Sequence, residues 1–419
     1  MSKELVKLST LIEEISMGPF GSDIKVDCFV DEGVPVLNGA NLTEYKLVEN
    51  SFRYVTKEKA KSFNKAIAKR GDIVITHRGT LGQISYIQND SKFEEYVISQ
   101  SQFKVRVNQK LVDPIYLVYY FHTNEGQRRL LANKCHVGVP ALAQATTNFR
   151  LIEIPLPDLS IQHKIASVLS SLDSKIELNN RINAELEGMA KLLYDYWFVQ
   201  FDFPNAEGKP YKSSGGKMIW NGELKREVPE GWEVGTLLDI ADYANGLPCQ
   251  KFRPDGHEFL RVIKIREMNE GGFSDNSEQV KPDIPAKSII ENGDVLFSWS
   301  ASLEVKIWTG GKGALNQHIF KVTSSKYPKS FYYFQLVNYL QHFKMMAENR
   351  KTTMGHITQE HLQQSRIAIP PKALTQELDK IIAPLFEMKI KNDIENERLS
   401  SLRDWLLPML MNGQITIDN

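Results

Sequence analysis

The sequence predicts an α+β protein in which two tandem α/β domains are separated by two long helices that form an antiparallel, coiled-coil-like pair with pseudo-twofold symmetry. Three observations support this fold class: an internal duplication, short alternating strands in each half, and a long amphipathic stretch that ends each half. A chain of 419 residues also exceeds one ordinary hydrophobic core, because domains usually hold about 100–200 residues.

The duplication is visible in segments that recur in the same order. RGDIVITHRGT recurs as NGDVLFSWSAS, SQSQFKVRV as NQHIFKVTS, and LIEIPLPDLSIQHKI as RIAIPPKALTQELDKI. The stretch from Gly18 to Leu42 more loosely parallels the stretch from Gly246 to Met268. Matched segments in one order indicate that both halves share one fold.

Each half begins with a mixed segment that carries the predicted strands. These are DIVIT and FKVRV in the first half and DVLFSW and IFKV in the second, bounded by Gly, Asn and Asp. The pairs Gly71-Asp72 and Gly293-Asp294 are interpreted as turn chemistry, in which Gly supplies a positive φ and Asp caps the turn.

Each half ends in a predicted helix, from about Ile161 to Phe198 and from about Thr375 to Met411, because apolar residues recur there at spacings of three, four and seven. One such stripe needs a partner, either the preceding domain or the other helix. A length of roughly 55 Å favours the other helix. Pro384 is expected to kink and interrupt the second helix. The predicted boundaries are 1–158 for the first domain, 159–200 for its helix, 201–217 for a linker, 218–372 for the second domain and 373–414 for its helix.

Composition excludes several classes of protein. Lys+Arg and Asp+Glu balance at 51 each, which excludes a strongly basic, histone-like DNA binder but not a local basic groove. Cys28, Cys135 and Cys249 lie too far apart for a metal knuckle, and their odd number argues against a secreted disulfide framework. The sequence shows no signal peptide and no membrane-length apolar run, so we expect a cytoplasmic protein.

Motifs of self-contained enzymes are missing from the sequence. It has no phosphate-binding GxxxxGK[ST] loop, no GxGxxG, no Asn-Pro-Pro-Tyr or Asp-Pro-Pro-Tyr, and no GxSxG. His356 and His361 are five residues apart, whereas two zinc ligands on one helical face are four apart. We therefore expect no catalytic residues and no bound metal or cofactor in this chain.

Two related domains joined by rigid helices suit a target with two parts at a fixed separation, such as two DNA half-sites. Gln and Arg can each make two hydrogen bonds to base edges, and Lys and Arg can contact phosphates. The candidate DNA-binding residues are Ser22, Lys25, Asn38, Thr76, Arg78, Thr80, Gln83, Gln100, Gln102 and Lys134 in the first half, and Lys264, Arg266, Ser298, Ser300, Gln317, His318, Arg350, Lys351 and Thr352 in the second.

Nearly the whole chain resembles specificity subunits of type I restriction–modification systems. The resemblance rests on MGPFGSDIK, GDIVITHRGTLG, and the duplicated block that runs from Ile-Pro through Gln into a long helix with a Leu-rich end. The second copy lacks an equivalent of Leu172-Asp173 and contains Pro384. Where the first half has Arg78-Gly79-Thr80, the second has Ser300-Ala301-Ser302, as two domains with different DNA targets would require.

The resemblance implies a subunit without catalytic activity. Its two domains would be target recognition domains for a bipartite, asymmetric sequence in double-stranded DNA, and its helices would set the spacing and dock two methyltransferase subunits. Restriction subunits that translocate DNA would join them, and the partners would bring S-adenosylmethionine, ATP and Mg²⁺. The candidate docking residues are Ile165, Leu172, Ile176, Leu186, Leu193, Leu385, Leu399, Leu402 and Leu406.

Three other interpretations stay open at the level of sequence. The same fold could serve a methylation-only complex without a nuclease. It could also be a protein-binding scaffold that never contacts DNA, or an enzyme with an unrecognised site. Salt-dependent DNA binding would distinguish a DNA-binding subunit from a scaffold.

Overall fold

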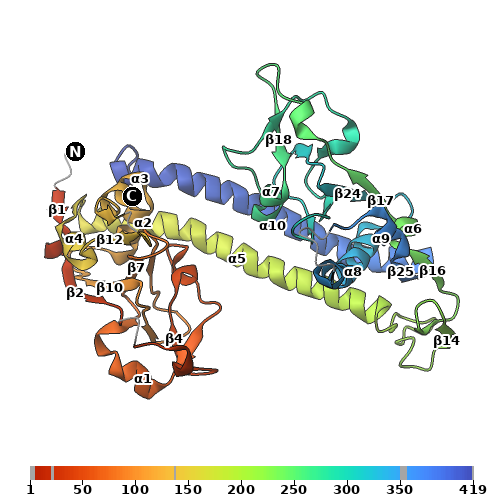
Figure 1. Ribbon diagram of the computed structural model, residues 1–419, viewed down its shortest axis with the longest axis horizontal. Coiled ribbons are helices and arrows are strands. Elements are labelled where there is room, and N and C mark those ends of the chain that lie inside the picture. The colour runs from red at the N-terminus through yellow and green to blue at the C-terminus, as the bar shows by residue number, and fades with distance from the viewer. Residues whose placement is uncertain (1–4, 20–22, 136–137, 350–355, 418–419) are drawn as a thin grey trace. The chain divides into compact units, whose positions relative to one another are not determined.

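The computed structural model describes residues 5–19, 23–135, 138–349 and 356–417. The chain divides into two compact units, the first comprising Met1–Asp173 and Ser401–Asn419 and the second Ser174–Ser400. Figure 1 shows that the chain consists of strands, short helices and two long helices, α5 and α10. Parts of both long helices belong to each unit.

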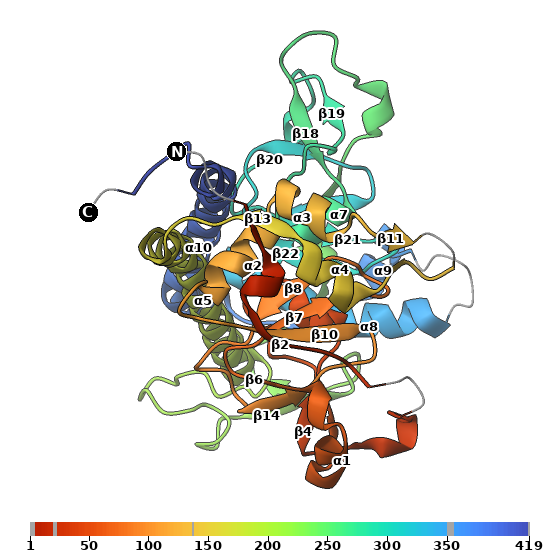
Figure 2. The same ribbon diagram turned by 90° about the vertical axis from the view of Figure 1, so that its left-hand side faces the viewer.

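The first unit contains an antiparallel sheet of order β2-β10-β7-β8, whose strands Figure 2 labels. A second sheet has the order β3-β5-β4-β9-β6, and β1 pairs with β13. The strands are β1 (Leu5–Lys7), β2 (Ile12–Met17), β3 (Phe29–Val30), β4 (Val34–Val36), β5 (Arg53–Val55), β6 (Ile67–Lys69), β7 (Ile73–Thr76), β8 (Ile84–Tyr86), β9 (Glu95–Val97), β10 (Gln102–Val107), β11 (Lys134–Cys135), β12 (Ala141–Leu142) and β13 (Glu153–Pro155). The helices are α1 (Lys57–Ser62), α2 (Pro114–His122), α3 (Asn124–Leu130), α4 (Ala145–Leu151) and the start of α5 (Leu159–Phe198).

The second unit repeats this plan. Its sheet β17-β24-β21-β22 corresponds to β2-β10-β7-β8, and the pair β16·β25 corresponds to β1·β13. The strands are β14 (Met218–Asn221), β15 (Arg226–Pro229), β16 (Glu233–Thr236), β17 (Asp242–Asn245), β18 (Leu260–Ile263), β19 (Gln279–Val280), β20 (Ile289–Ile290), β21 (Val295–Ser298), β22 (Glu304–Ile307), β23 (Gly313–Leu315), β24 (Ile319–Thr323) and β25 (Arg366–Ile369). The helices are α6 (Leu237–Ile240), α7 (Ile265–Glu270), α8 (Lys329–Asn349), α9 (Gln359–Gln364) and α10 (Lys372–Asn412). The four strands predicted from the duplicated segments are confirmed as β7, β10, β21 and β24.

The Gly-Asp pairs form equivalent turns before the central strands, as predicted. Gly71 and Gly293 have φ values of +90° and +92°. The carboxylate of Asp72 accepts a hydrogen bond from the backbone N–H of Lys69 at 2.9 Å. The carboxylate of Asp294 accepts one from Glu291 N–H at 2.8 Å.

The two predicted long helices are confirmed, and their ends are buried. Near the start of α5, Ile165 and Leu169 pack into the core of the first unit, where residues from the end of α10 join them. In the second unit, Tyr194 and Phe198 near the end of α5 share a core with residues from the start of α10. Each long helix thus contributes to both hydrophobic cores, which adds a role to the predicted helix pair.

Polar side chains hold the central turns of α5 and α10 together within the second unit. Asn179 Nδ2 donates to Asn396 Oδ1 at 2.9 Å, and Asn392 Nδ2 donates to Asn183 Oδ1 at 2.9 Å. We call these four residues the asparagine cluster. As the residue number rises on one helix it falls on the other, so the pair is antiparallel. Asn179 and Asn183 recur as Asn392 and Asn396 in the duplicated block, so the two contacts are related by a pseudo-twofold axis.

The expected interruption at Pro384 is wrong, because α10 is helical without a break from Lys372 to Asn412. Proline removes a single backbone hydrogen bond. Leu378, Ile382 and Phe386 are buried in the core on both sides of it, which holds the helix in register. The predicted linker, residues 201–217, is packed where it begins, since Phe201 is buried against Trp232 with ring centroids 5.2 Å apart.

Two glycines allow close backbone approach at equivalent places. A Cβ at Gly18 would lie 1.9 Å from Ser99 O, and one at Gly246 would lie 2.2 Å from Leu315 O. We expect Gly18→Ala and Gly246→Ala each to lower the free energy of unfolding by about 1–3 kcal/mol, the usual cost of overpacking. Gly188→Ala on α5, where a Cβ meets nothing within 4 Å, should raise it by about 0.5–1 kcal/mol. Urea denaturation of the three variants checks this, and a Gly18→Ala variant as stable as the wild type would contradict it.

Candidate nucleic-acid interface

Equivalent hydrogen bonds build the same loop framework after the central strand of each unit. In the first unit, His77 N–H donates to Ser101 O at 2.8 Å, and Leu142 N–H donates to His77 O at 2.8 Å. In the second, Trp299 N–H donates to His318 O at 3.3 Å, and Ile357 N–H donates to Trp299 O at 3.0 Å. His77 and Trp299 therefore occupy the same structural position.

The loops that follow also take the same path. Gly79 has φ +86° and Ala301 has φ +60°, so the left-handed conformation recurs even where the residue is not glycine. An alanine in this conformation costs roughly 1–2 kcal/mol, which surrounding contacts must offset. In the first unit the turn leaves Arg78 and Thr80 exposed. No hydrogen bond or ion pair of the Arg78 side chain exists within the described ranges.

The first unit gathers several predicted side chains around this loop. His77 Nε2 donates to Gln100 O at 3.2 Å, and burial lowers the pKa of His77, so its imidazole is neutral at neutral pH with Nδ1 as an acceptor. A Cβ at Gly39 would lie 2.9 Å from Gln83 Oε1 and 4.0 Å from Thr80 Oγ1, which places both beside Asn38. Lys134 is exposed on β11, where it lies opposite Leu142 of β12 in an antiparallel strand pair.

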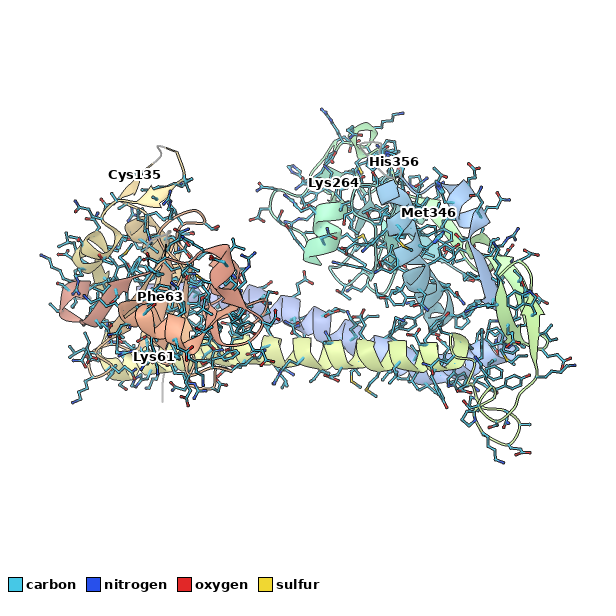
Figure 3. All side chains as sticks on the ribbon, turned by 60° about the horizontal axis from the view of Figure 1, so that its bottom comes forward. Lys61, Phe63, Cys135, Lys264, Met346 and His356 are labelled. Carbon is cyan, nitrogen blue, oxygen red and sulfur yellow. The ribbon has the colours of Figure 1, made fainter. Side chains whose placement is uncertain are left out.

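The second unit has an aromatic cluster at the equivalent place. The Trp299 ring lies 5.5 Å from the His318 ring and 5.6 Å from the His356 ring, which Figure 3 labels. Trp299 Nε1 donates to Asn245 Oδ1 at 3.0 Å. Gln317 lies next to this cluster, with its Nε2 3.4 Å from His318 Nε2. An indole near two imidazoles offers aromatic surface and hydrogen-bonding groups, unlike the arginine in the first unit.

Four predicted DNA contacts are buried and need correction. Thr76, Gln102, Ser298 and Ser300 are at most 4% exposed, because each lies at or just beyond one end of a central strand with its side chain facing inward. Ser298 Oγ donates to the carbonyl oxygen of Ser302, with the carbonyl oxygen of Ser300 3.4 Å away, and so holds the turn. Gln102 Oε1 accepts from Ser99 N–H at 2.9 Å. These residues support the loops and do not form their surface.

The predicted basic residues differ in availability. Lys25 is exposed. Lys264, labelled in Figure 3, pairs with Glu278 at 2.7 Å, and Arg266 pairs with the buried Glu267 at 2.6 Å. Both charges are thus neutralised within the second unit. Four further candidates lie outside the described residues, namely Ser22, Arg350, Lys351 and Thr352.

The predicted docking residues are mostly covered by the chain itself. Ile165 and Leu186 are buried, while Leu193 and Leu385 pack against the core of the second unit and Leu406 against that of the first. Leu172, Ile176 and Leu399 are half-buried, and Leu402 is exposed. The apolar residues at helical spacing on α5 and α10 therefore pack mainly into the chain's own cores.

Two exposed apolar pairs lie on the long helices, and of their four residues only Leu402 was among the predicted docking residues. Met189 and Leu192 on α5 are 52% and 67% exposed, and Leu402 and Trp405 on α10 are 44% and 53% exposed. Each pair lies at the same distance along the chain from Asn179 or Asn392, so the pairs are repeat-equivalent. The first belongs to the second unit and the other to the first. Sequence alone could not separate them from core positions.

Two kinds of feature are absent from the described ranges. Residues 5–19, 23–135, 138–349 and 356–417 contain no group of three His, Cys, Asp or Glu side chains that could hold a metal ion. In the same ranges, no helix is both long enough and apolar enough to cross a membrane.

Comparison with known proteins gives one family. The model of the type I restriction modification DNA specificity domain matches residues 27–188 and again residues 229–403. The chain is 26% identical over 384 residues to the type I restriction enzyme MjaIX specificity subunit of Methanocaldococcus jannaschii, which covers 90% of this chain and 84% of the relative. It is 24% identical over 410 residues to the HindI specificity subunit of Haemophilus influenzae, covering 84% and 88%. The crystal structure of the type I S subunit from M. genitalium has a similar fold, with a TM-score of 0.59 at 14% identity over 99% of this chain and 96% of that one.

Proposed function

Since the chain belongs to the family of type I restriction–modification DNA specificity subunits, we propose that each of its units recognises one half of a bipartite, asymmetric DNA target. Such a subunit is not itself an enzyme and works with DNA and with other subunits of the system. The observation that carries the proposal is the duplicated loop framework with unlike side chains. Arg78 stands where the second unit has Ser300, and His77 stands where it has Trp299.

The helix pair supports a proposal about spacing. Each long helix contributes to both cores, and the asparagine cluster fixes how the helices are aligned. Buried asparagines specify register between helices at some cost in stability. The length of the helix pair would then determine the number of unread base pairs between the two half-sites.

The exposed apolar pairs support docking of two methyltransferase subunits. Repeat-equivalent pairs, Met189 with Leu192 and Leu402 with Trp405, offer two similar surfaces, one on each unit. Large exposed apolar side chains are typical of protein interfaces. In this proposal the partners bring S-adenosylmethionine for methylation, and restriction subunits bring ATP and Mg²⁺ for cleavage. A methylation-only complex would use the same surfaces.

The experiment that tests the proposed function compares the chain alone with the chain plus its methyltransferase subunit. Alone, it should neither methylate nor cleave DNA. With the partner and S-adenosylmethionine, it should direct methylation of one bipartite motif, and DNA affinity should fall steeply with salt because phosphate contacts release counterions. Methylation by the chain alone would contradict the division of labour, and a complex that does not bind DNA would favour the scaffold.

Arg78→Ala is expected to relax the motif at one base position. Its guanidinium is exposed and unpaired within the described ranges, and a bidentate contact to guanine contributes about 1–3 kcal/mol of discrimination. Arg128→Ala, on α3 of the same unit and 76% exposed, serves as the control and should leave the motif unchanged. Sequencing of methylated DNA gives the result. A uniform loss of methylation at every sequence would assign Arg78 to a phosphate instead.

A further inference from the structure

The edge strands of the two duplicated sheets differ in one respect. In the first unit, the outer edge of β8 is covered by the chain itself, because Tyr86 N–H donates to Tyr45 O at 2.8 Å and Leu47 N–H donates to Tyr86 O at 2.9 Å. In the second unit, β22 is the corresponding edge strand. Nothing in the described part of the chain pairs with its outer edge. All four residues of β22 are half-buried, whereas those of β8 are fully buried.

The outward backbone groups of β22 follow from its register. Trp308 N–H donates to Asp294 O, and Gly293 N–H donates to Trp308 O. The first unit has the equivalent pair: Ile87 N–H donates to Asp72 O, and Gly71 N–H donates to Ile87 O. Val295 pairs with Ile307 in the next position, which in an antiparallel ladder is a non-hydrogen-bonded pair. The N–H and C=O of Ile307 therefore point away from β21, in the direction in which Tyr86 meets Tyr45 and Leu47.

A groove of about 540 Å³ lies along this open edge, entirely within the second unit. Val305 and Ile307 form its strand side, and the nearly buried Trp308, Tyr333 and Phe386 form its apolar floor. Gly271 and Gly272, which have no side chains, lie at its border and leave room beside the strand.

The charge of the groove points to the chemistry of an occupant. Glu187 and Glu397 line it and have no ion-pair partner among the described residues. Its lysines are already engaged, since Lys389 pairs with Asp393 at 3.1 Å and Lys306 Nζ donates to Asn269 O at 3.0 Å. A basic side chain would complement the two free carboxylates, whereas a nucleic-acid phosphate would be repelled.

We propose that β22 accepts an extended segment of a partner subunit, which adds to the sheet as Tyr45–Leu47 adds to β8. The segment would hydrogen-bond to Ile307 N–H and C=O, place apolar side chains against Trp308 and Phe386, and direct a Lys or Arg toward Glu187 and Glu397. Strand addition of this kind draws affinity from main-chain hydrogen bonds and specificity from alternate side chains. This inference rests on the proposed function, because the segment belongs to a protein that assembles with this chain.

Hydrogen exchange on the full chain tests the proposal directly. In the free chain, the Ile307 amide should exchange fast and the Tyr86 amide slowly. Assembly with the methyltransferase subunit should slow exchange at Ile307 by about tenfold or more, because a new hydrogen bond protects it. An Ile307 amide that is already protected in the free chain, or that stays unprotected in an active complex, would overturn the proposal. Protection that needs DNA and no partner would overturn it too.

A matched pair of variants tests the groove. Gly272→Trp should fill it, since a Cβ there meets nothing within 4 Å, and should weaken assembly about tenfold or more. Gly256→Trp has equal space outside the groove and should assemble normally. Thermal melting shows whether each variant folds. If Gly272→Trp misfolds, a second pair of variants takes its place. Ile307→Pro removes the outward N–H and should weaken assembly, and Ile307→Val serves as its control. If a folded groove variant assembles normally, the strand-addition proposal is wrong and the proposed function still stands. If the wild-type chain binds no methyltransferase subunit, both are wrong.

Discussion

Replacing residues 5–155 with the equivalent segment of a relative is expected to change one half of the methylated motif completely and leave the other half unchanged. The segment contains the whole mixed part of the first half, including Arg78 and the loop framework around His77. The matched exchange of residues 233–369 should change only the other half. Sequencing of methylated DNA from cells with each hybrid measures both results.

The structure determines where the exchange should begin and end. β1 pairs with β13, from Leu5 opposite Pro155 to Lys7 opposite Glu153, and β16 pairs with β25, from Glu233 opposite Ile369. Ends at these pairs keep each sheet intact. An exchange of residues 18–150 would instead separate β2 from β10, which pair over most of their length. We expect the 18–150 hybrid to methylate the same motif as the 5–155 hybrid but to be less stable. If both half-sites changed in the 5–155 hybrid, the units would not recognise DNA independently.

Much of the fold could be predicted because its signals are local. The strands β7 and β21 follow a glycine turn and carry consecutive apolar residues, and α5 and α10 carry apolar residues at helical spacing. Because the chain is duplicated, an element predicted in one half could be checked against the matching segment of the other half. The interruption expected at Pro384 failed because burial on both sides of a proline, such as that of Leu378 and Phe386, is a tertiary effect.

The candidate site was harder to predict, since it depends on which way each side chain points. Thr76 and Arg78 are two residues apart, yet one is buried and the other exposed. The turn at Gly79 and the contact with Leu142 decide this, and the second of these joins segments far apart in sequence. His77 and Trp299 were missed, although the aligned GDIVITH and GDVLFSW place them at one position and could have indicated them.

The asparagine cluster shows the same limit. Asn179 and Asn183 lie on an otherwise amphipathic helix, where asparagine usually faces solvent. Both are buried, at 1% and 5% exposure, because each meets a side chain of α10. Nothing within α5 alone reveals that partner, so the sequence did not indicate these contacts.

Inserting four helix-favouring residues into both long helices is expected to lengthen the spacer between the half-sites by one or two base pairs. The insertions belong after Asn183 in α5 and before Asn392 in α10, because these residues lie opposite each other. Four residues add about 6 Å of helix and about 40° beyond a full turn. That length corresponds to roughly two base pairs at about 3.4 Å each. The asparagine cluster stays intact in this variant, so the helices keep their alignment.

The same insertion in α5 alone, between Asn179 and Asn183, should abolish methylation. It moves Asn179 away from Asn183, so the two can no longer both meet their partners, Asn396 and Asn392, on α10. It also lengthens only one of two helices whose ends are both buried in cores, as Leu169 and Tyr194 are on α5, so some core residues must leave their places. Removing a large apolar side chain from a core costs about 2–5 kcal/mol, a large share of a typical domain's stability.

Methylated-motif sequencing and thermal melting separate the possible results for these two variants. The paired insertion should melt near the wild type and methylate two unchanged half-sites across a longer spacer. A stable, active paired variant with an unchanged spacer would show that something other than the length of α5 and α10 determines the distance. A single insertion in α5 that is active with a longer spacer would show that α10 does not constrain α5, contrary to the hydrogen bonds between Asn183 and Asn392.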